Sequence, residues 1–411
     1  MDAEIIAVGS ELLTPYRQDT NSLYLTGKLN SLGIEVRFKT IVGDDAAHLA
    51  QVLREALGRS ALIILIGGLG PTEDDVNREV VAKVLERPLH EEPQIRRRIE
   101  ARFARAGRTM SPNNLRQAQV PEGVEWIENQ NGTAPGLWIE HQGIVMILLP
   151  GPPRELEAMF ESKCLPRLAR IASGTVLRSR VLKVVGLPES EVDHRIAPIY
   201  KPYTNPSTTI LAMPGGIEIH LRARAANATA AEALLAELGD KIESVLGDFV
   251  FSTGGETLEE IVGRYLALRH KTLAVAESCT GGLLSERLTR VAGSSNYFLG
   301  GTVCYSNELK TKLAAVPAQL IEKHGAVSKS VARALAEGIR RRTGDYIGIG
   351  ITGVAAPGGG TGEKPVGLVF IALADERGLQ VREFRFPGDR ERVRQLTTTA
   401  ALEIIRRRIR D

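Results

Sequence analysis

The seven residues AESCTGG at 276–282 place three side chains with reactive or hydrogen-bonding atoms directly before two glycines. The apolar stretch KTLAVA precedes them, and LLSERLTRV behind them has the spacing of an amphipathic helix. The pattern predicts a strand, a tight turn and a helix, with Ser278 at the carboxyl edge of a sheet. This arrangement suits acyl transfer with Ser278 as the nucleophile. The N–H groups that would form an oxyanion hole at the helix start belong to Cys279, Thr280, Gly281 and Gly282.

A serine nucleophile needs a base, and the histidines of this region are poorly placed for that role. His270 precedes the predicted strand at its amino end. His324 ends a predicted helix before Gly325, where a charged residue is ordinary. We therefore look for the base among the lysines.

Lys310 is the stronger candidate for the base. In VCYSNELK, Tyr305 ends the next predicted strand, and Lys310 lies about one turn into the following helix. Strand ends of one sheet lie near each other, and a lysine removed from water gives up its proton more readily. Ser–Lys pairs are a known nucleophile–base arrangement. Spacing alone leaves two alternatives open: Tyr305 and Lys310 as ordinary edge residues, and Lys312, on another helix face, as the base.

Cys279 is an alternative nucleophile, because a thiol at a helix N-terminus has a lowered pKa. No histidine lies near it in the sequence. We therefore interpret Cys279 as a small buried residue or an amide donor.

A second candidate site is the glycine turn GGLGPTEDD at 67–75, between the strand ALIILI and the predicted helix DVNREVVAKVL. Glycines after a buried strand let the backbone approach a ligand closely, and a helix N-terminus suits phosphate. The turn is neither a Walker A loop nor the dinucleotide fingerprint, whose third glycine is replaced by Glu73. A turn stabilised by Asp74 and Asp75, without a ligand, is the alternative.

Two further glycine-proline loops accompany this turn. They are NGTAPG at 131–136 and LPGPPRE at 149–155, each beside a predicted strand. Loops at the strand ends of a parallel sheet converge at one edge, where ligands bind in open α/β folds. The three loops together predict a phosphate site at that edge.

The elements that must position these residues form two α/β patterns. Through residue 170, strands (EIIAVG, EVRFKTIV, ALIILIG, GIVMILLP) alternate with helices at 20–33, 44–58, 74–86, 91–106 and 153–170. Continuous apolar strands between helices predict a mostly parallel sheet covered on both faces. A second such pattern begins near residue 256, after a small α+β segment. We predict domains at 1–172, 173–252 and 253–411.

Bulk composition excludes several classes of protein. The 411 residues are 43% hydrophobic and 25% charged, with a net charge of +3, too small to favour nucleic acid or anionic membrane. Three unpaired cysteines fit a reducing cytosol and give no zinc pattern. No apolar run is long enough for a signal peptide or a membrane span, so we expect a cytoplasmic protein. We interpret the basic run RRRIR at 406–410 as the solvated last turn of a helix.

The glycine loops of the first domain resemble the molybdopterin-binding domain, a three-layer α/β fold. GSELL at 9–13 with DTN at 19–21 makes this domain similar to that of the competence/damage-inducible CinA family. Departures from the family are Asn77, where a threonine is usual, and TPYRQ at 14–18. The resemblance implies a pyrophosphatase that cleaves ADP-ribose with a divalent metal, for which Mg²⁺ is the expected ion.

The same resemblance implies specific residues for that reaction. The diphosphate would contact Gly67, Gly68, Gly70, Thr72, Asn131, Gly132 and Gly151. Asp75 would bind or orient the metal, with contributions from Asp44 and Glu155. The middle segment is similar to a KH domain, but it lacks the GxxG loop that clamps RNA, so we expect a structural or dimerising role without RNA binding.

The last domain resembles the CinA C-terminal domain, which is similar to nicotinamide mononucleotide deamidases. The matching motifs are AESCTGG, AGSSNYF, VCYSNELK, HGAVS, ITGVAAPGGG, KPVGLV and FPGDR, with Ala356 as one departure from a usual glycine. The resemblance implies Ser278 as nucleophile, Lys310 as base and Tyr305 as its helper, without a cofactor. Substrate contacts would come from the turn residues 279–282 and from Asn307, Gly353 and Arg390, the last facing the 5′-phosphate. The family also implies a homodimer.

Two rival functions remain from other classes. The family name suggests a non-catalytic partner in DNA uptake or damage response, but aromatic residues are only 5% of the chain and its charge is nearly balanced. The first domain could instead be a molybdopterin-binding scaffold. The small molecules expected as partners are nicotinamide mononucleotide and ADP-ribose.

Overall fold

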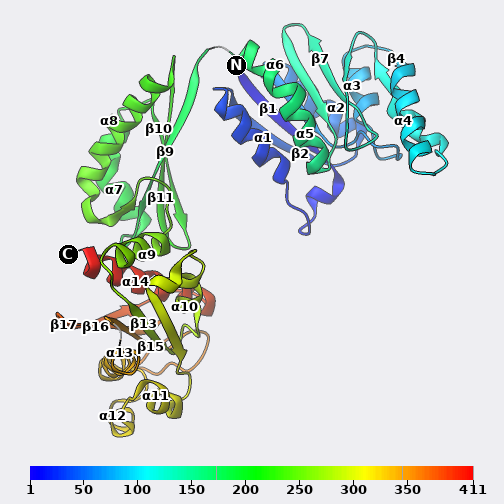
Figure 1. Cartoon of the computed structure of the whole chain (residues 1–411). Coiled ribbons are helices and arrows are strands. Elements are labelled where there is room, and N and C mark those ends of the chain that lie inside the picture. The colour runs from blue at the N-terminus through cyan, green and yellow to red at the C-terminus, as the bar shows by residue number, and fades with distance from the viewer. Residues whose placement is uncertain (173, 345, 411) are drawn as a thin grey trace. The chain divides into compact units, whose positions relative to one another are not determined.

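The computed structural model describes residues 1–172, 174–344 and 346–410. They divide into two compact units (Figure 1): an N-terminal unit, Met1–Arg178 with Arg222–Leu235, and a C-terminal unit, Ser179–Leu221 with Ala236–Asp411. The predicted domain boundary at 173 and the predicted strand start at 345 lie outside the described residues. No helix in the described ranges is long and apolar enough to cross a membrane.

The N-terminal unit is built on a six-stranded sheet in the order β2-β1-β3-β8-β7-β6. Four neighbouring strands are parallel: β2 (Glu35–Val42), β1 (Asp2–Val8), β3 (Leu62–Ile66) and β8 (Ile144–Leu149). The sequence analysis did not predict the two antiparallel strands that extend this sheet, β7 (Gly136–His141) and β6 (Glu125–Ile127). The sequence pattern did not reveal these strands because both are short and a glycine or proline near each one interrupts the run of apolar residues.

Helices cover both faces of this sheet, because consecutive strand side chains point to opposite sides. Ile6 and Ile63 pack in one apolar cluster with α2 (Ala46–Leu57), α3 (Asn77–Val84) and α4 (Pro93–Arg105). Ile5 and Ile64 pack in another with α1 (Thr20–Ser31), α5 (Pro153–Met159) and α6 (Leu165–Ile171). The predicted three-layer α/β fold is thereby confirmed. Two short strands, β4 (Leu89–Glu91) and β5 (Gln119–Pro121), pair separately.

The single helix predicted over 153–170 is interrupted. A π-helical turn, Phe160–Cys164, separates α5 from α6. Pro166 follows this turn and lacks an N–H, so a regular α-helix could not continue through it. The prediction of one uniform helix was wrong at this point.

The middle segment forms a small α+β arrangement, as predicted. Its four-stranded sheet has the order β10-β11-β9-β12, with strands β10 (Ser207–Met213), β11 (Gly216–Ala225), β9 (Val176–Val184) and β12 (Val250–Ser252). Its helices are α7 (Glu189–Tyr200) and α8 (Ala228–Leu246).

The five-stranded sheet of the C-terminal unit has the order β14-β13-β15-β16-β17. Its first three strands are parallel, β14 (Phe298–Val303), β13 (Leu273–Glu277) and β15 (Ile347–Gly353), and two antiparallel strands follow, β16 (Leu368–Asp375) and β17 (Gly378–Arg385). One apolar cluster joins the sheet to α9 (Leu258–Leu268), α10 (Leu283–Thr289) and α14 (Arg390–Arg410). A second cluster joins it to α11 (Asn307–Ala314), α12 (Ala318–His324) and α13 (Lys329–Thr343).

The basic run at the end of α14 is not the solvated turn that the sequence suggested. Arg406 is only 2% exposed and pairs with Glu403. Arg408 pairs with the buried Asp375, and Arg410 with Asp248. Glu403 lies three residues before Arg406 in the same helix, but Asp375 and Asp248 come from elements distant in sequence, so the charge run alone could not reveal this ion-pair network.

Candidate functional site

The predicted catalytic residues gather at one edge of the C-terminal sheet. Strands β13, β14 and β15 are parallel, so all three end at this edge. Two backbone hydrogen bonds tie these ends together. The Cys304 N–H donates to the Glu277 carbonyl (2.7 Å), and the Ser278 N–H donates to the Ile351 carbonyl (3.1 Å). The turn that carries Ser278 is therefore held between both neighbouring strands.

The other motifs of this domain reach the same edge through the antiparallel strands. Gly353 pairs with Val369 in β16, and Leu368 pairs with Arg385 at the end of β17. The glycine loop 354–367 and the segment 386–389 before α14 therefore lie at this edge. Arg390, at the start of α14, donates to the Tyr305 hydroxyl at 2.5 Å. Four chain segments meet here, which the order of motifs along the sequence did not reveal.

The serine turn, residues 276–282, offers fewer free donors than predicted. The Gly281 N–H donates to the Ser278 carbonyl (3.1 Å), and the Gly282 N–H donates to the Glu277 carboxylate (3.1 Å). Both N–H groups therefore already donate to an acceptor within the turn and are not free to bind a substrate oxygen. In the part of the chain that the structure describes, the N–H groups of Cys279 and Thr280 have no backbone or carboxylate acceptor. Of the four N–H groups predicted as oxyanion donors, those of Gly281 and Gly282 are therefore not free.

Glu277 is a positioning residue that the sequence analysis missed. Its side chain is fully buried and accepts from the N–H groups of Gly282, Leu284 and Ser285 and from the Ser285 hydroxyl. A carboxylate at the first turn of α10 satisfies N–H groups that have no partner within the helix. The only signal in the sequence was a glutamate at the end of an apolar strand.

We expect Glu277→Gln to lower the free energy of unfolding by about 2–4 kcal/mol, because the amide NH₂ would face backbone N–H donors and lose the charge-assisted bonds. Urea denaturation followed by circular dichroism measures this. The matched control is Glu286→Gln, which removes only an exposed pair with Arg290 on the same helix and should cost at most about 0.5 kcal/mol. Equal losses in the two variants would contradict this role of Glu277.

Lys310 is buried at the serine edge, with 2% of its surface exposed. Its Nζ donates to the carbonyls of Cys304 (3.0 Å) and Tyr305 (3.2 Å). The two carbonyls can accept from either the ammonium or the neutral amine, so these bonds fix the position of Nζ and not its charge. Burial also lowers the pKa of Lys310.

The rival lysine and histidine lie elsewhere. Lys312 is exposed and pairs with Glu308 one turn earlier in α11. His324 ends α12, where its carbonyl accepts from Lys364 (2.7 Å). Neither side chain is buried at the serine edge, so Lys310 remains the candidate base.

Tyr305 and Asn307 lie at the outer side of this edge. Tyr305 is 57% exposed, and its hydroxyl is bonded to Arg390, whereas its backbone carbonyl accepts from Lys310. Arg390 also donates to the Ala356 carbonyl at 3.5 Å, so it joins α14 to the glycine loop. Asn307 begins α11 and is exposed. Across the described ranges no hydrogen bond joins the Ser278 hydroxyl to Lys310; such bonds are often long before substrate binds.

Cys279 has the character of a buried thiol. It is 5% exposed, and burial raises its pKa to about 12. A Cβ atom added at Gly353 would lie 3.0 Å from its sulfur and 2.8 Å from the Leu368 carbonyl, so the turn and the glycine loop are in close contact. The neighbouring Thr280 carbonyl accepts two bonds from Arg394, a residue that the sequence analysis did not select.

The glycine turn of the N-terminal unit lines a cleft of about 610 Å³ at the carboxyl edge of its sheet. Of the predicted phosphate-binding residues, Gly67, Gly68, Gly70 and Gly151 line this N-terminal cleft, but Thr72, Asn131 and Gly132 do not. Parts of the GSELL and DTN segments line it as well, namely Gly9, Glu11, Leu12, Asp19, Thr20 and Asn21.

The carboxylates predicted to bind metal all line this cleft, but each already accepts a hydrogen bond from another protein group. Asp75 accepts from the N–H and hydroxyl of Thr72 (2.9 and 2.5 Å). Asp44 accepts from the Ser10 N–H (2.7 Å), and Glu155 accepts from the Asn129 amide (2.6 Å). Among residues 1–172, 174–344 and 346–410, no three His, Cys, Asp or Glu side chains are grouped to hold a metal. The cleft fits an ion bound by one or two carboxylates and by substrate phosphates, as Mg²⁺ often is.

Asn77, the departure from the usual threonine, supports the glycine turn. It is fully buried, and its amide donates to the Gly67 carbonyl at 2.7 Å. The buried Arg78 holds the carbonyls of Leu69 and Gly70 at 2.6 and 2.7 Å. The side chains of Asn77 and Arg78 therefore hold the backbone of the glycine turn in place through its carbonyl groups.

Comparison with known proteins assigns each part of the chain. Residues 255–409 match the family model of the CinA C-terminal domain, 4–170 that of the probable molybdopterin binding domain, and 179–252 that of the damage-inducible protein CinA KH domain. A CinA-like protein of Koribacter versatilis is 54% identical over 413 residues, 100% of each chain. A CinA-like protein of Solibacter usitatus is 51% identical over 100% of this chain and 98% of its own. A putative competence-damage inducible protein of Moorella thermoacetica is 45% identical over 100% and 99%.

Proposed function

The chain belongs to the CinA family, and from that premise we propose that its last domain hydrolyses the amide of nicotinamide mononucleotide to nicotinate mononucleotide and ammonia. The observation that carries this proposal is the burial of the Lys310 amine at the sheet edge that bears Ser278, because burial lowers the pKa of Lys310. A buried amine with a lowered pKa can act as the base for a serine nucleophile at the same sheet edge.

In the proposed reaction, the Ser278 hydroxyl attacks the carboxamide carbon while Lys310 takes its proton. The N–H groups of Cys279 and Thr280 stabilise the oxyanion that forms. Collapse of this intermediate breaks the C–N bond, and the proton held by Lys310 passes to the leaving ammonia. Water, deprotonated by Lys310, then attacks the acyl carbon, the bond from this carbon to Ser278 Oγ breaks, and Lys310 returns its proton to Ser278 as the product leaves.

Arg390 has two roles in this proposal. It lies beside the exposed Tyr305 and the glycine loop, where a guanidinium could pair with the 5′-phosphate of the substrate. It also joins the loop to α14, so substrate binding would stabilise a closed loop. Tyr305, bonded to Arg390, contributes to this recognition more directly than to proton transfer.

The test is ammonia release from nicotinamide mononucleotide by the purified full-length protein in a buffer with a chelator. Formation of nicotinate mononucleotide in equal amount, by chromatography, identifies the reaction as amide hydrolysis. Without release, the serine turn would be a binding site at most, as in the alternative of a non-catalytic partner in DNA uptake or damage response.

A second candidate function belongs to the N-terminal cleft. The glycine turn and the acidic side chains of Asp44 and Asp75 at one sheet edge favour a metal-dependent pyrophosphatase that cleaves ADP-ribose. The metal would neutralise phosphate charge, and the turn would hold the diphosphate. A molybdopterin-binding scaffold is the alternative. The homodimer and the cytoplasmic location also stay predictions.

We expect Asp75→Asn to reduce ADP-ribose cleavage in the presence of Mg²⁺ by about 100-fold or more, because the metal and the turn both depend on this carboxylate. Release of AMP from ADP-ribose is the measurement. Glu73→Gln in the same turn is the matched control, since the Glu73 side chain is 96% exposed and does not line the cleft. Cleavage that is lost in neither variant would contradict the assignment of Asp75.

A further inference from the structure

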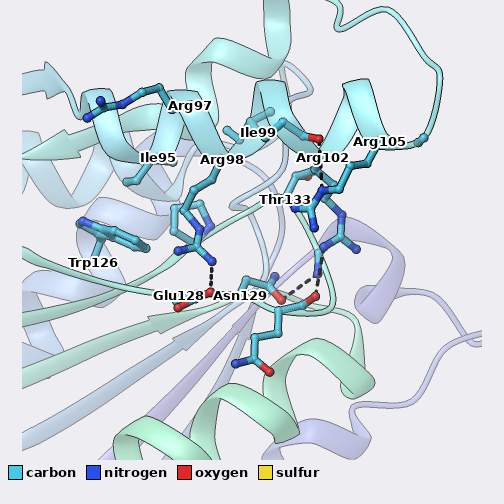
Figure 2. A pocket seen from close by; sticks show the side chains of 15 residues that line it. Ile95, Arg97, Arg98, Ile99, Arg102, Arg105, Trp126, Glu128, Asn129 and Thr133 are labelled. Atoms are coloured by element: carbon cyan, nitrogen blue, oxygen red, sulfur yellow. Dashed lines mark hydrogen bonds and ion pairs between the residues drawn. The ribbon is translucent and has the colours of Figure 1, made fainter.

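A second cavity in the N-terminal unit belongs to neither proposed reaction. This arginine pocket has a volume of about 700 Å³ and lies between α4 and the loop 128–133 (Figure 2). Its apolar wall comes from Ile95, Ile99 and Trp126. Its polar side includes four arginines of α4: Arg97, Arg98, Arg102 and Arg105.

The arginines that face the loop are incompletely neutralised. Arg98 pairs with Glu128, the acidic residue of the pocket. Arg102 donates to the carbonyls of Gln130 (3.0 Å) and Asn131 (2.8 Å), and Arg105 donates to the carbonyl of Ala101 in its own helix (3.3 Å). Neither Arg102 nor Arg105 forms an ion pair with a carboxylate in the described part of the chain.

The lack of carboxylate partners does not extend to every arginine of α4. Arg96, on the same helix, pairs with both Glu91 and Glu100. Arg102 and Arg105, three residues apart, lie on one helix face, where like charges repel. Figure 2 shows both reaching toward the loop beside Thr133. An anion between them would relieve this repulsion and use N–H groups that backbone carbonyls do not fill.

We propose that the arginine pocket binds a small phosphate-bearing molecule, with its phosphate between Arg102 and Arg105 and its apolar part against Trp126. The volume is that of a small-molecule site. The surface is concave and local, and the net charge of the chain is only +3, which does not favour nucleic acid. Arginine suits phosphate because its planar guanidinium donates two parallel bonds.

The pocket is separate from the N-terminal cleft but shares a wall with it. Thr133 lines both cavities. A Cβ atom added at Gly132 would lie 2.0 Å from a Glu155 oxygen, so the loop lies directly against the cleft carboxylate. A molecule in the arginine pocket would therefore contact the back of the cleft wall, without entering the proposed reaction.

The experiment titrates the full-length protein with inorganic pyrophosphate and follows tryptophan fluorescence. Trp126 lines the pocket, whereas Trp138 is buried in the core and 4% exposed, so Trp126 is the reporter. We expect Arg105→Gln to weaken binding by roughly ten-fold or more, and Arg105→Lys by less. The matched control is Arg54→Gln on α2, an exposed residue of the same unit that lines neither cavity.

Three comparisons decide the outcome. The proposal is supported if Arg105→Gln weakens pyrophosphate binding, Arg54→Gln does not, and the fluorescence change is absent in Trp126→Phe. Equal weakening in both arginine variants, or no saturable binding by the wild type, overturns it. A fluorescence change that persists in Trp126→Phe would place the pyrophosphate outside the arginine pocket and also overturn the proposal. If the protein did not cleave ADP-ribose, the proposed pyrophosphatase activity would be wrong, but the pyrophosphate titration would still test the arginine pocket.

Discussion

Ser278→Ala is expected to reduce ammonia release from nicotinamide mononucleotide by roughly three orders of magnitude or more, because no covalent intermediate can form without the hydroxyl. Removal of one oxygen from a residue that is 8% exposed leaves the backbone bond from the Ser278 N–H to Ile351 intact. The variant should therefore fold and bind substrate. Initial rates of ammonia release, with circular dichroism as the check on folding, measure the effect.

The matched control for Ser278 is the adjacent Cys279→Ala. Burial raises the pKa of this thiol to about 12, so almost no thiolate exists near neutral pH. Cys279 also packs near Gly353, so its substitution should have a modest effect on rate through packing alone. If Cys279→Ala abolished release and Ser278→Ala did not, the nucleophile would be the thiol and the proposed mechanism would be wrong.

Much of the serine edge could be predicted from local patterns. An apolar strand, a glycine turn and an amphipathic spacing placed Ser278 at a strand end, and the same logic placed Lys310 in the first turns of α11. Periodicity and turn residues are local properties, so a single sequence carries them. The covered parallel sheet of the N-terminal unit followed in the same way from apolar strands that alternate with helices, whereas its molybdopterin-binding-like character came from the resemblance of its glycine loops.

The partners of buried charges could not be predicted, because they depend on contacts between distant segments. Glu277 looked like the end of a strand, yet its carboxylate fixes the serine turn. Arg408 and Arg410 looked solvated, yet they pair with Asp375 and Asp248, which are near them only in the folded chain. The bond from the Gly282 N–H to the Glu277 carboxylate removes one of the donors that the sequence predicted for an oxyanion hole. Sequence patterns predict positions along elements, whereas hydrogen-bond assignments require three-dimensional coordinates.

Lys310→Met is expected to lower kcat/KM by roughly 100-fold to 10,000-fold, the usual contribution of a general base. In the wild type, kcat/KM should rise with pH as Lys310 loses its proton, and this rise should begin below the ordinary lysine pKa because burial lowers it. The rise should be absent in Lys310→Met. The matched control is Lys312→Met, which removes an exposed lysine from the same helix and should keep both the rate and the pH profile.

Stability gives an independent readout of the same amine. The pKa of Lys310 is lower in the folded state than in the unfolded chain, so the unfolded chain binds more protons between the two values. The free energy of unfolding should therefore rise with pH through this window, and the part due to Lys310 should vanish in Lys310→Met. A wild type and variant with parallel stability curves would mean that the amine is charged in the folded protein over the whole range. Lys310 could not then act as the base, and a normal rate in Lys310→Met would lead to the same conclusion.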